Sequence, residues 1–327
     1  MVRSALAAWL LTSAVLLGND GSAKANPVGG IQLTREARIS MEKERLTIGT
    51  GLVSVEYEFL NTTDRDITTE VAFPVPGYVI ASLFTPSVPG ALSGWHVWVE
   101  GKELQYQTEV KAAVNGVDYA TLLRKLAIDI ESFGHFNQRP DGQISSEIQK
   151  LPKAQQEELT RAGLVEDGIP GWTVLKTYHW QQRFPAHKIL HVKHEYSPEL
   201  GLEHLDLANL QGKIGEPFAK LSDSCVDPAL RKVLIEAVPN DNGFGGGGFI
   251  NPVWVDYILT TANTWKTPIK DFELVIEKPK PERHEQYYVS LCWDGKVERR
   301  SDGTFVAHAA NFVPKRELRV MFFQVGD

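Results

Sequence analysis

Alternation of apolar and polar residues along several separate segments is the feature that most constrains the fold of this chain. In LVSVEYEF, residues 52–59, every second side chain from Val53 to Phe59 is apolar, and the intervening Ser54, Glu56 and Glu58 are polar. Side chains of an extended strand point alternately to opposite faces, so a period of two predicts a strand with one buried face. Other strand-like segments are TTEVAF, WHVWVEGKELQYQTEV, WTVLKTYHWQQRF, KILHVKHEY, VDYILT, DFELVIE, YYVSLCW and ELRVMFF. We therefore predict a mainly β protein.

Helical patterns interrupt the strands in two places. Between about residues 111 and 171, DYATLLRKLAIDI spaces apolar residues at intervals of four, and KAQQEELTRAG combines helix formers with a preceding Pro152 and a final Gly163. A further helix is predicted over about 228–238, where Asp227 suits the N-cap and Pro228 suits the first turn.

The length of 327 residues exceeds one average domain of roughly 100–200 residues. We predict two immunoglobulin-like β-sandwich units. The first covers 26–200 and carries the helical insertion at about 111–171, and the second covers 201–327 and carries the helix at about 228–238.

Residues 1–25 have the pattern of a signal peptide. Arg3 gives a positive start, ALAAWLLTSAVLLG gives an apolar run, and AKA at 23–25 gives small residues at the cleavage positions. The run is shorter than the roughly 20 apolar residues that cross a bilayer. We predict cleavage that leaves a mature chain beginning near Asn26, a periplasmic or secreted location, and no membrane span after cleavage.

The two cysteines, Cys225 and Cys292, are predicted to form a disulfide, because an exported chain reaches an oxidising compartment. A catalytic thiol is the alternative. Neither cysteine has a histidine near it in the sequence, which disfavours that alternative.

The glycine run NDNGFGGGGFINP, residues 240–252, has the spacing of a dinucleotide-binding loop without its context. Such a loop follows a strand and precedes a helix, whose amides meet the pyrophosphate. Here a predicted helix comes before the glycines, and a strand follows Pro252. We interpret residues 243–248 as a connection and predict no cofactor.

Metal and catalytic sites are also disfavoured. A strand over KILHVKHEY places His191 and His194 on opposite faces, and His187 lies about 13 Å from His191 at strand rise, so these histidines do not converge on an ion. We predict no metal site, and we expect His194 to be a hydrogen-bonded core or edge residue. Hydrolase signatures are missing, and we assign no catalytic residue. The net charge of −7, with both signs mixed along the chain, argues against a nucleic-acid partner.

Two tryptophans are candidates for a binding surface. Alternation places Trp95 on an apolar face, whereas Trp98 shares its face with His96 and Glu100. Trp265 lies in the polar segment TANTWKTP. Aromatic rings offer large contact area at low entropic cost, so we predict that Trp98 and Trp265 are exposed and available to a ligand.

Several blocks of the sequence resemble one family. They are LNTTDRDITTEVAFPVP (60–76), YHWQQRFPA with HEYSP (178–198), CVDPALR (225–231), YILTTANTWKTPIKDFELVIEK (257–278), LCWDGKVE (291–298) and NFVPKREL (311–318). In this order they are similar to DUF4424, a bacterial exported family of unknown function. The resemblance implies an envelope or secreted protein with immunoglobulin-like β-sandwich character, and it places both cysteines in blocks where the family carries its own. It implies no reaction, substrate or catalytic residue.

These observations favour a non-enzymatic binding or structural component of the cell envelope, with an envelope protein or a glycan as partner. The alternative is a hydrolase that acts on an envelope polymer. The sequence does not specify an oligomeric state.

Overall fold

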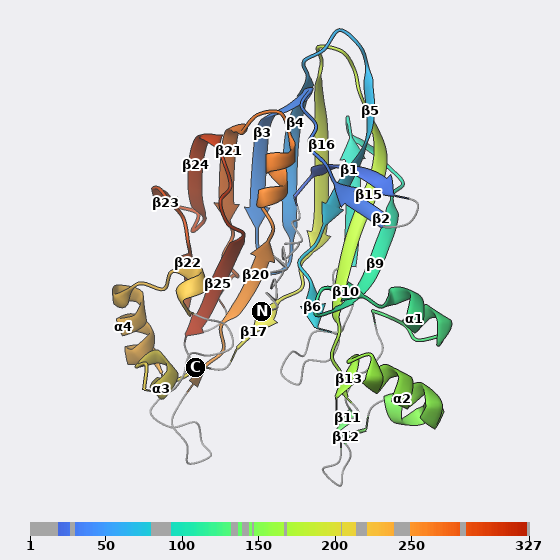
Figure 1. Cartoon of the computed structure of the whole chain (residues 1–327). Coiled ribbons are helices and arrows are strands. Elements are labelled where there is room, and N and C mark those ends of the chain that lie inside the picture. The colour runs from blue at the N-terminus through green and yellow to red at the C-terminus, as the bar shows by residue number, and fades with distance from the viewer. Residues whose placement is uncertain are drawn as a thin grey trace, which may run out of the picture.

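The computed structural model describes residues 19–26, 30–79, 93–131, 137–138, 144–145, 147–166, 169–203, 205–213, 221–238, 249–281 and 286–325. Three sheets of four, seven and eight strands form most of this part of the chain (Figure 1). The predicted mainly β fold is confirmed. The glycine run at 243–248 and His204 lie outside the described residues.

The largest sheet has eight strands in the order β23-β24-β21-β3-β4-β16-β7-β8. Their bounds are β23 (Val297–Arg299), β24 (Phe305–Phe312), β21 (Ile269–Ile276), β3 (Ile39–Ile48), β4 (Val53–Asn61), β16 (Ile189–Ser197), β7 (Ser93–Val99) and β8 (Lys102–Glu103). Neighbouring strands are antiparallel except β21 and β3, which run parallel with Asp271 opposite Lys43. Strands from both sides of residue 200 share this sheet, so the predicted division into two immunoglobulin-like units is not confirmed.

The seven-stranded sheet has the order β10-β9-β15-β5-β1-β2, with β6 beside β15. Its strands are β10 (Val117–Asp118), β9 (Gln107–Val114), β15 (Thr173–Phe184), β5 (Ile67–Pro74), β1 (Gly21–Asn26), β2 (Gly30–Leu33) and β6 (Tyr78–Val79). β1 pairs with β5 from Gly21 to Ala23. The cleavage site predicted after Ala25 therefore falls inside a strand of this sheet.

The four-stranded sheet has the order β17-β20-β25-β22. Its strands are β17 (Gly201–Leu202), β20 (Val253–Tyr257), β25 (Leu318–Val325) and β22 (Gln286–Leu291). Three short pairs complete the strands: β11 (Asn137–Gln138) with β12 (Ile144–Ser145), β13 (Val165–Glu166) with β14 (Ile169–Pro170), and β18 (Leu205–Asp206) with β19 (Phe249–Ile250).

The helices are short and lie at the lower edge of the sheets in Figure 1, apart from η3. They are α1 (Ala120–Lys125), α2 (Lys153–Arg161), α3 (Leu207–Leu210) and α4 (Pro228–Ala237), with the 3-10 turns η1 (Glu147–Lys150), η2 (Leu221–Ser224) and η3 (Thr260–Thr264). Asp227 caps α4 by accepting a 2.7 Å hydrogen bond from the Leu230 amide, as predicted. The first predicted helix is shorter than its pattern suggests, because the chain turns left-handed at Ala127, where φ is 56°.

The main core lies between one face of the eight-stranded sheet and the seven-stranded and four-stranded sheets, which lie in front of it in Figure 1. In β4, every second residue from Val53 to Phe59 is buried, as the alternation predicts. In β16 the same holds from Leu190 to Tyr196. The intervening polar residues of β4 and β16 therefore form the outer, solvent-facing surface of the large sheet.

Two smaller cores flank the main one. The helical insertion packs Leu123 and Leu159 with Trp172. On the other side, Leu234 of α4 packs against Met321 and Phe323, which project from the face of β25 opposite the main core. The Cys225–Cys292 disulfide joins the segment before α4 to the chain that follows β22, with a Cα–Cα distance of 4.9 Å. The predicted disulfide is thus confirmed.

Candidate functional site

A hollow of about 450 Å³ lies on the outer face of the eight-stranded sheet. Strands β3, β4, β16 and β7 supply its lining, and Gly101 in the turn after β7 also borders it. Because Tyr57 and its alternating neighbours in β4 point into the core, the intervening polar residues must point out and line the hollow.

One cross-strand row of charged side chains crosses the hollow. Lys43 of β3 pairs with Glu58 of β4, and Glu58 pairs in turn with His191 of β16. Directly opposed side chains of an antiparallel sheet have Cβ atoms about 4.5–5.5 Å apart. The row thus holds a carboxylate between an ammonium group and an imidazole.

A second row runs beside the first and ends on an aromatic ring. Arg45, Glu56 and Lys193 lie opposite one another on β3, β4 and β16, and Lys193 lies opposite Trp98 of β7. Lys193 Nζ is 5.8 Å from the centre of the Trp98 ring, within the range of a cation–π contact. The His96 ring stacks on the same tryptophan with centroids 5.5 Å apart.

Trp98 is half-buried and lines the hollow, which agrees with its predicted place on the polar face. The neighbouring turn is formed by Glu100 and Gly101, whose φ angles of 49° and 73° give a tight hairpin. Glu100 also accepts a 2.8 Å hydrogen bond from the His191 amide, which holds the turn against β16. The contact of Trp98 with a ligand stays a prediction.

The hollow retains unused hydrogen-bonding capacity. Within the described part of the chain, Lys43, Glu56 and Glu58 make no hydrogen bond or ion pair with another side chain. Donors and acceptors that are open to solvent beside an aromatic ring can bind a polar ligand that also has an apolar face.

A second hollow, of about 370 Å³, lies near Trp293 and Cys292. Three of its charged side chains are already engaged: Arg316 donates to Asp294 at 2.6 Å, and Glu317 accepts from the Leu259 amide at 2.7 Å. The first hollow is therefore the better candidate site.

Trp265, the other predicted surface tryptophan, lies in the core and is 1 % exposed. Its ring packs on Phe59 with centroids 4.8 Å apart, and its Nε1 donates a 2.7 Å hydrogen bond to the Asp20 carbonyl. The prediction of an exposed Trp265 is wrong. The polar residues around Trp265 suggested an exposed segment, but one of them, Thr261, is itself buried and hydrogen-bonded.

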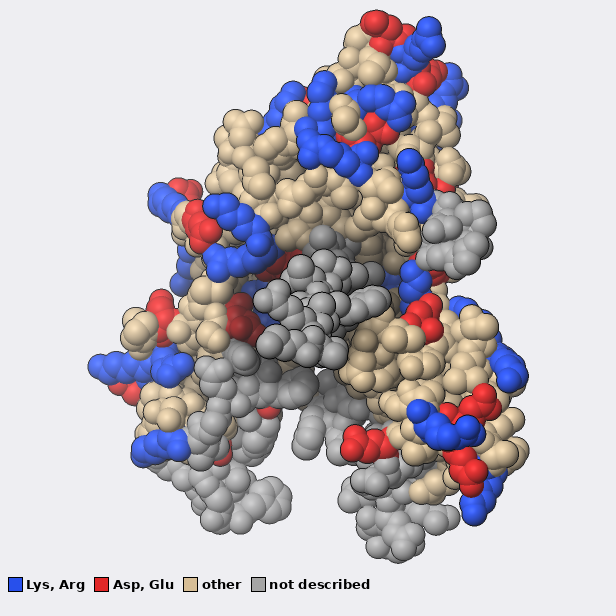
Figure 2. All heavy atoms as spheres, in the orientation of Figure 1, with Lys and Arg blue, Asp and Glu red and all other residues tan. Residues whose placement is uncertain are grey.

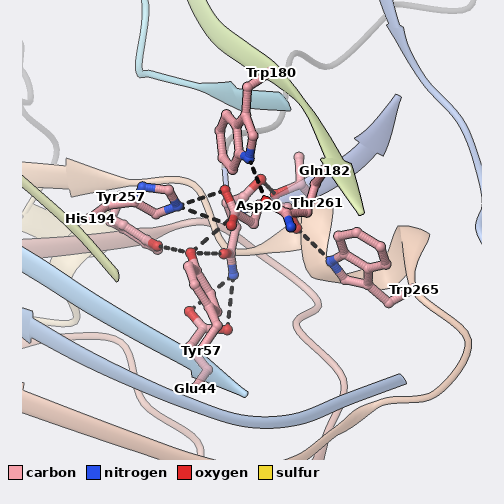
Figure 3. Close-up of polar contacts among 10 residues, drawn as sticks. Asp20, Glu44, Tyr57, Trp180, Gln182, His194, Tyr257, Thr261 and Trp265 are labelled. Atoms are coloured by element: carbon pink, nitrogen blue, oxygen red, sulfur yellow. Dashed lines mark hydrogen bonds and ion pairs between the residues drawn. The ribbon is translucent and has the colours of Figure 1, made fainter. Parts of the chain in front are cut away.

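A buried polar cluster lies inside the main core (Figure 3). His194 Nε2 is 2.9 Å from both carboxylate oxygens of Asp20, and both side chains are fully buried. The hydroxyls of Tyr57 and Tyr257 lie 3.1 Å apart beside this pair. The expectation that His194 is a hydrogen-bonded core residue is confirmed. Its partner, Asp20, lies in the segment that the sequence pattern assigns to the signal peptide.

Burial dominates the electrostatics of this cluster. It raises the pKa of Asp20 above its usual value, although the adjacent His194 opposes the shift. It also raises the pKa of Glu44 to about 8, with the Asn19 amide opposing and the Asp20 charge adding to the effect. The pKa values of Tyr57 and Tyr257 are raised well above the usual range for the same reason. The cluster is thus rich in acidic groups kept from water.

The described residues contain no group of three or more His, Cys, Asp or Glu side chains placed to hold a metal ion. A helix with the length and apolar character to cross a membrane is likewise not found in the described part of the chain. Figure 2 shows acidic side chains among the basic ones on the face turned to the viewer.

Layered, mostly antiparallel sheets around one polar cluster, with a charged and aromatic hollow outside, define a β-rich protein with a candidate ligand surface. The chain belongs to the DUF4424 family, a domain of unknown function, whose profile matches residues 18–321. Comparison with curated proteins gives no match. Among solved structures, a "putative nutrient binding protein" from Legionella pneumophila is similar at 12 % identity and a TM-score of 0.39, covering 88 % of this chain and 68 % of that one.

Proposed function

We propose that this chain is an exported, non-enzymatic binding component of the cell envelope, which holds a glycan in the hollow beside Trp98. The observation that carries the proposal is the pair of cross-strand rows, in which open charged groups lie next to a half-buried indole ring.

A sugar ring suits this surface because it has two kinds of face. Its C–H face can stack on Trp98, whereas its hydroxyls can accept from Lys43 and donate to Glu58. The mixed charge also suits envelope glycans that carry both carboxylate and amide groups.

The export part of the proposal is supported by the disulfide. Cys225 and Cys292 are joined, and such bonds persist in oxidising compartments, whereas cytosolic thiols are kept reduced. Fractionation after osmotic shock tests the location, and a chain that stays in the cytosolic fraction would contradict export.

Calorimetric titration with soluble peptidoglycan fragments tests the binding role. We expect saturable binding that Trp98→Ala abolishes and Trp98→Phe partly retains, since Phe keeps an aromatic face. Glu58→Gln should weaken binding several-fold, whereas Glu298→Gln, an exposed carboxylate on β23 outside the hollow, should leave it unchanged. Equal binding by Trp98→Ala and the wild type would refute this site.

A hydrolase is the second candidate, because Glu56 and Glu58 point into the same hollow. Residues two apart on a strand lie roughly 7 Å apart, within the carboxylate separation of inverting glycosidases. Glu56 is exposed, and thus lacks the water-excluding surroundings typical of a general acid. Release of reducing ends from peptidoglycan, abolished by both Glu56→Gln and Glu58→Gln, would favour this candidate over binding alone.

A further inference from the structure

Asn19 lies in the centre of the main core, although the sequence pattern assigns it to the leader. Its side-chain amide donates to both carboxylate oxygens of Glu44 at 3.0 Å, and its side-chain oxygen accepts a hydrogen bond from the Tyr57 hydroxyl. Its carbonyl accepts a 2.6 Å hydrogen bond from Thr261. These partners belong to β3, β4 and η3, so one residue connects three separate elements.

Asp20 makes equally extensive contacts (Figure 3). Its carboxylate accepts from His194 Nε2 at 2.9 Å, and its carbonyl accepts from Trp265 Nε1 at 2.7 Å. Its amide lies 3.4 Å from the Tyr57 hydroxyl, to which it donates. Without this residue, His194 Nε2 and Trp265 Nε1 would each lose the hydrogen-bond partner that they have in the core, which is costly for a buried polar atom.

The strand that follows, β1, is also hydrogen-bonded to other parts of the fold. Ser22 donates from its amide to Thr264 at 3.0 Å, and Thr34 donates to the Ser22 carbonyl at 2.7 Å. The family match begins at residue 18 and so includes this segment. Cleavage after Ala25 would remove Asn19, Asp20 and most of β1, so the leader must end earlier.

The surroundings of Glu44 are a second observation that bears on where the chain begins. Glu44 is fully buried, and among the described residues no cationic side chain bonds to it. Burial raises its pKa to about 8 while Asn19 remains in peptide linkage. An ionised carboxylate in such a place needs a nearby positive charge. Asn19 already binds Glu44 through its side-chain amide. If the chain began at Asn19, the backbone nitrogen of the same residue would be a charged ammonium group.

We propose that the leader is removed at the Gly18–Asn19 bond and that the new α-ammonium group of Asn19 stays in the core and pairs with Glu44. The inference rests on the proposed export. A leader peptidase adds water across the bond: the hydroxyl joins the Gly18 carbonyl carbon, the C–N bond breaks, and the Asn19 nitrogen takes up protons to become the ammonium. Gly18, directly before the bond, is small, as such enzymes prefer, whereas Leu16 two residues earlier departs from their usual small-residue pattern.

Amino-terminal sequencing of the protein recovered from the exported fraction tests the cleavage site. We expect the sequence Asn-Asp-Gly-Ser. A processed chain that begins at Asn26 or elsewhere overturns this inference and leaves export intact. An unprocessed chain inside the cell overturns export and this inference together.

Thermal unfolding tests the ion pair. Two purified forms are compared, one beginning at Asn19 and one carrying Gly-Ser before Asn19. We expect the form with the free ammonium to unfold at a higher temperature by at least a few degrees, and Glu44→Gln to remove most of that difference. In the matched control Glu298→Gln, the difference should persist. Equal unfolding temperatures of the two wild-type forms, or an undiminished difference in Glu44→Gln, would overturn the pairing.

A spectroscopic titration covers the case in which Glu44→Gln does not fold. The carbon-13 shift of the Glu44 carboxyl group, followed against pH, should give a lower pKa in the form that begins at Asn19 than in the extended form. The same pKa in both forms would overturn the pairing without any substitution.

Discussion

His191 and His194 lie three residues apart on β16, and alternation gives them opposite surroundings. His191 is exposed at the hollow, whereas His194 is buried against Asp20. Sequence reasoning placed both on the correct faces. It could not supply the Asp20 partner, because a contact across 174 residues leaves no local pattern.

Replacing His194 should therefore be far more costly than replacing His191. In His194→Leu, the Asp20 carboxyl group loses its partner in the core, and we expect a loss of about 3–5 kcal/mol in the free energy of unfolding. His191→Ala on the same strand should cost less than about 1 kcal/mol. Urea unfolding measures both, and similar midpoints for the two variants would contradict the role given to the buried pair.

Glu44 should make stability depend on pH in the form extended before Asn19. Its pKa is about 8 in the folded protein, above the ordinary value of 4.5, so the folded state keeps a proton that the unfolded chain has released. This contribution is complete below the unfolded pKa and is lost as pH rises toward 8, at a slope of up to about 1.4 kcal/mol per pH unit. Glu44→Gln should lack that part of the slope. Parallel stability profiles for the two proteins between pH 5 and 8 would contradict the shift.

Trp98 and Trp265 show where the residue pattern succeeds and fails. Trp98 was placed on the correct face because it lies within an alternating strand, although its side chain is half-buried and not exposed. Trp265 was placed wrongly, because it follows a 3-10 turn. In such a turn side chains do not alternate between two faces, and polar neighbours are a poor guide to burial.

At the scale of elements, the ends of α1 and α2 contain a matched pair of alanines. Ala127 has φ of 56°, a conformation that costs an L-residue about 1–2 kcal/mol, whereas Ala162 at the end of α2 has φ of −78°. We expect Ala127→Gly to stabilise the protein by roughly 0.5–1 kcal/mol and Ala162→Gly to destabilise it by a similar amount. Differential denaturation of the two variants checks the opposite signs, and destabilisation by both would contradict the left-handed geometry.

β1 is one of the strands that sequence reasoning missed. GSAKAN has no apolar alternation, and its small residues match a cleavage motif as well as a strand. The strand forms because β5 offers it a partner and because the two residues before it are held in the core. Neither cause is visible in the segment itself.

At the scale of the whole molecule, the disulfide closes a loop between residues 67 apart in the sequence. The chain-entropy relation gives it roughly 4 kcal/mol of stabilisation. Thermal unfolding with and without reductant should show a clear decrease in melting temperature on reduction, and Cys225→Ser with Cys292→Ser should reproduce it. No decrease would mean that the segment before α4 is held by packing alone.

The eight-stranded sheet contains strands from both sides of the predicted boundary at residue 200. Alternation identifies strands but not their neighbours, and β3 pairs with β21 across more than half of the chain. Length alone favoured two units, whereas the main core draws on residues from Ile39 to Phe322.

The parallel contact of β3 with β21 has a consequence for biosynthesis. A ribosome must finish residues 269–276 before the central strand β3 can acquire its second neighbour. Until then the nascent polypeptide lacks a complete large sheet, and such distant pairings form slowly. A topology that closes late leaves the emerging chain without its complete large sheet for longer, which would favour the export proposed above.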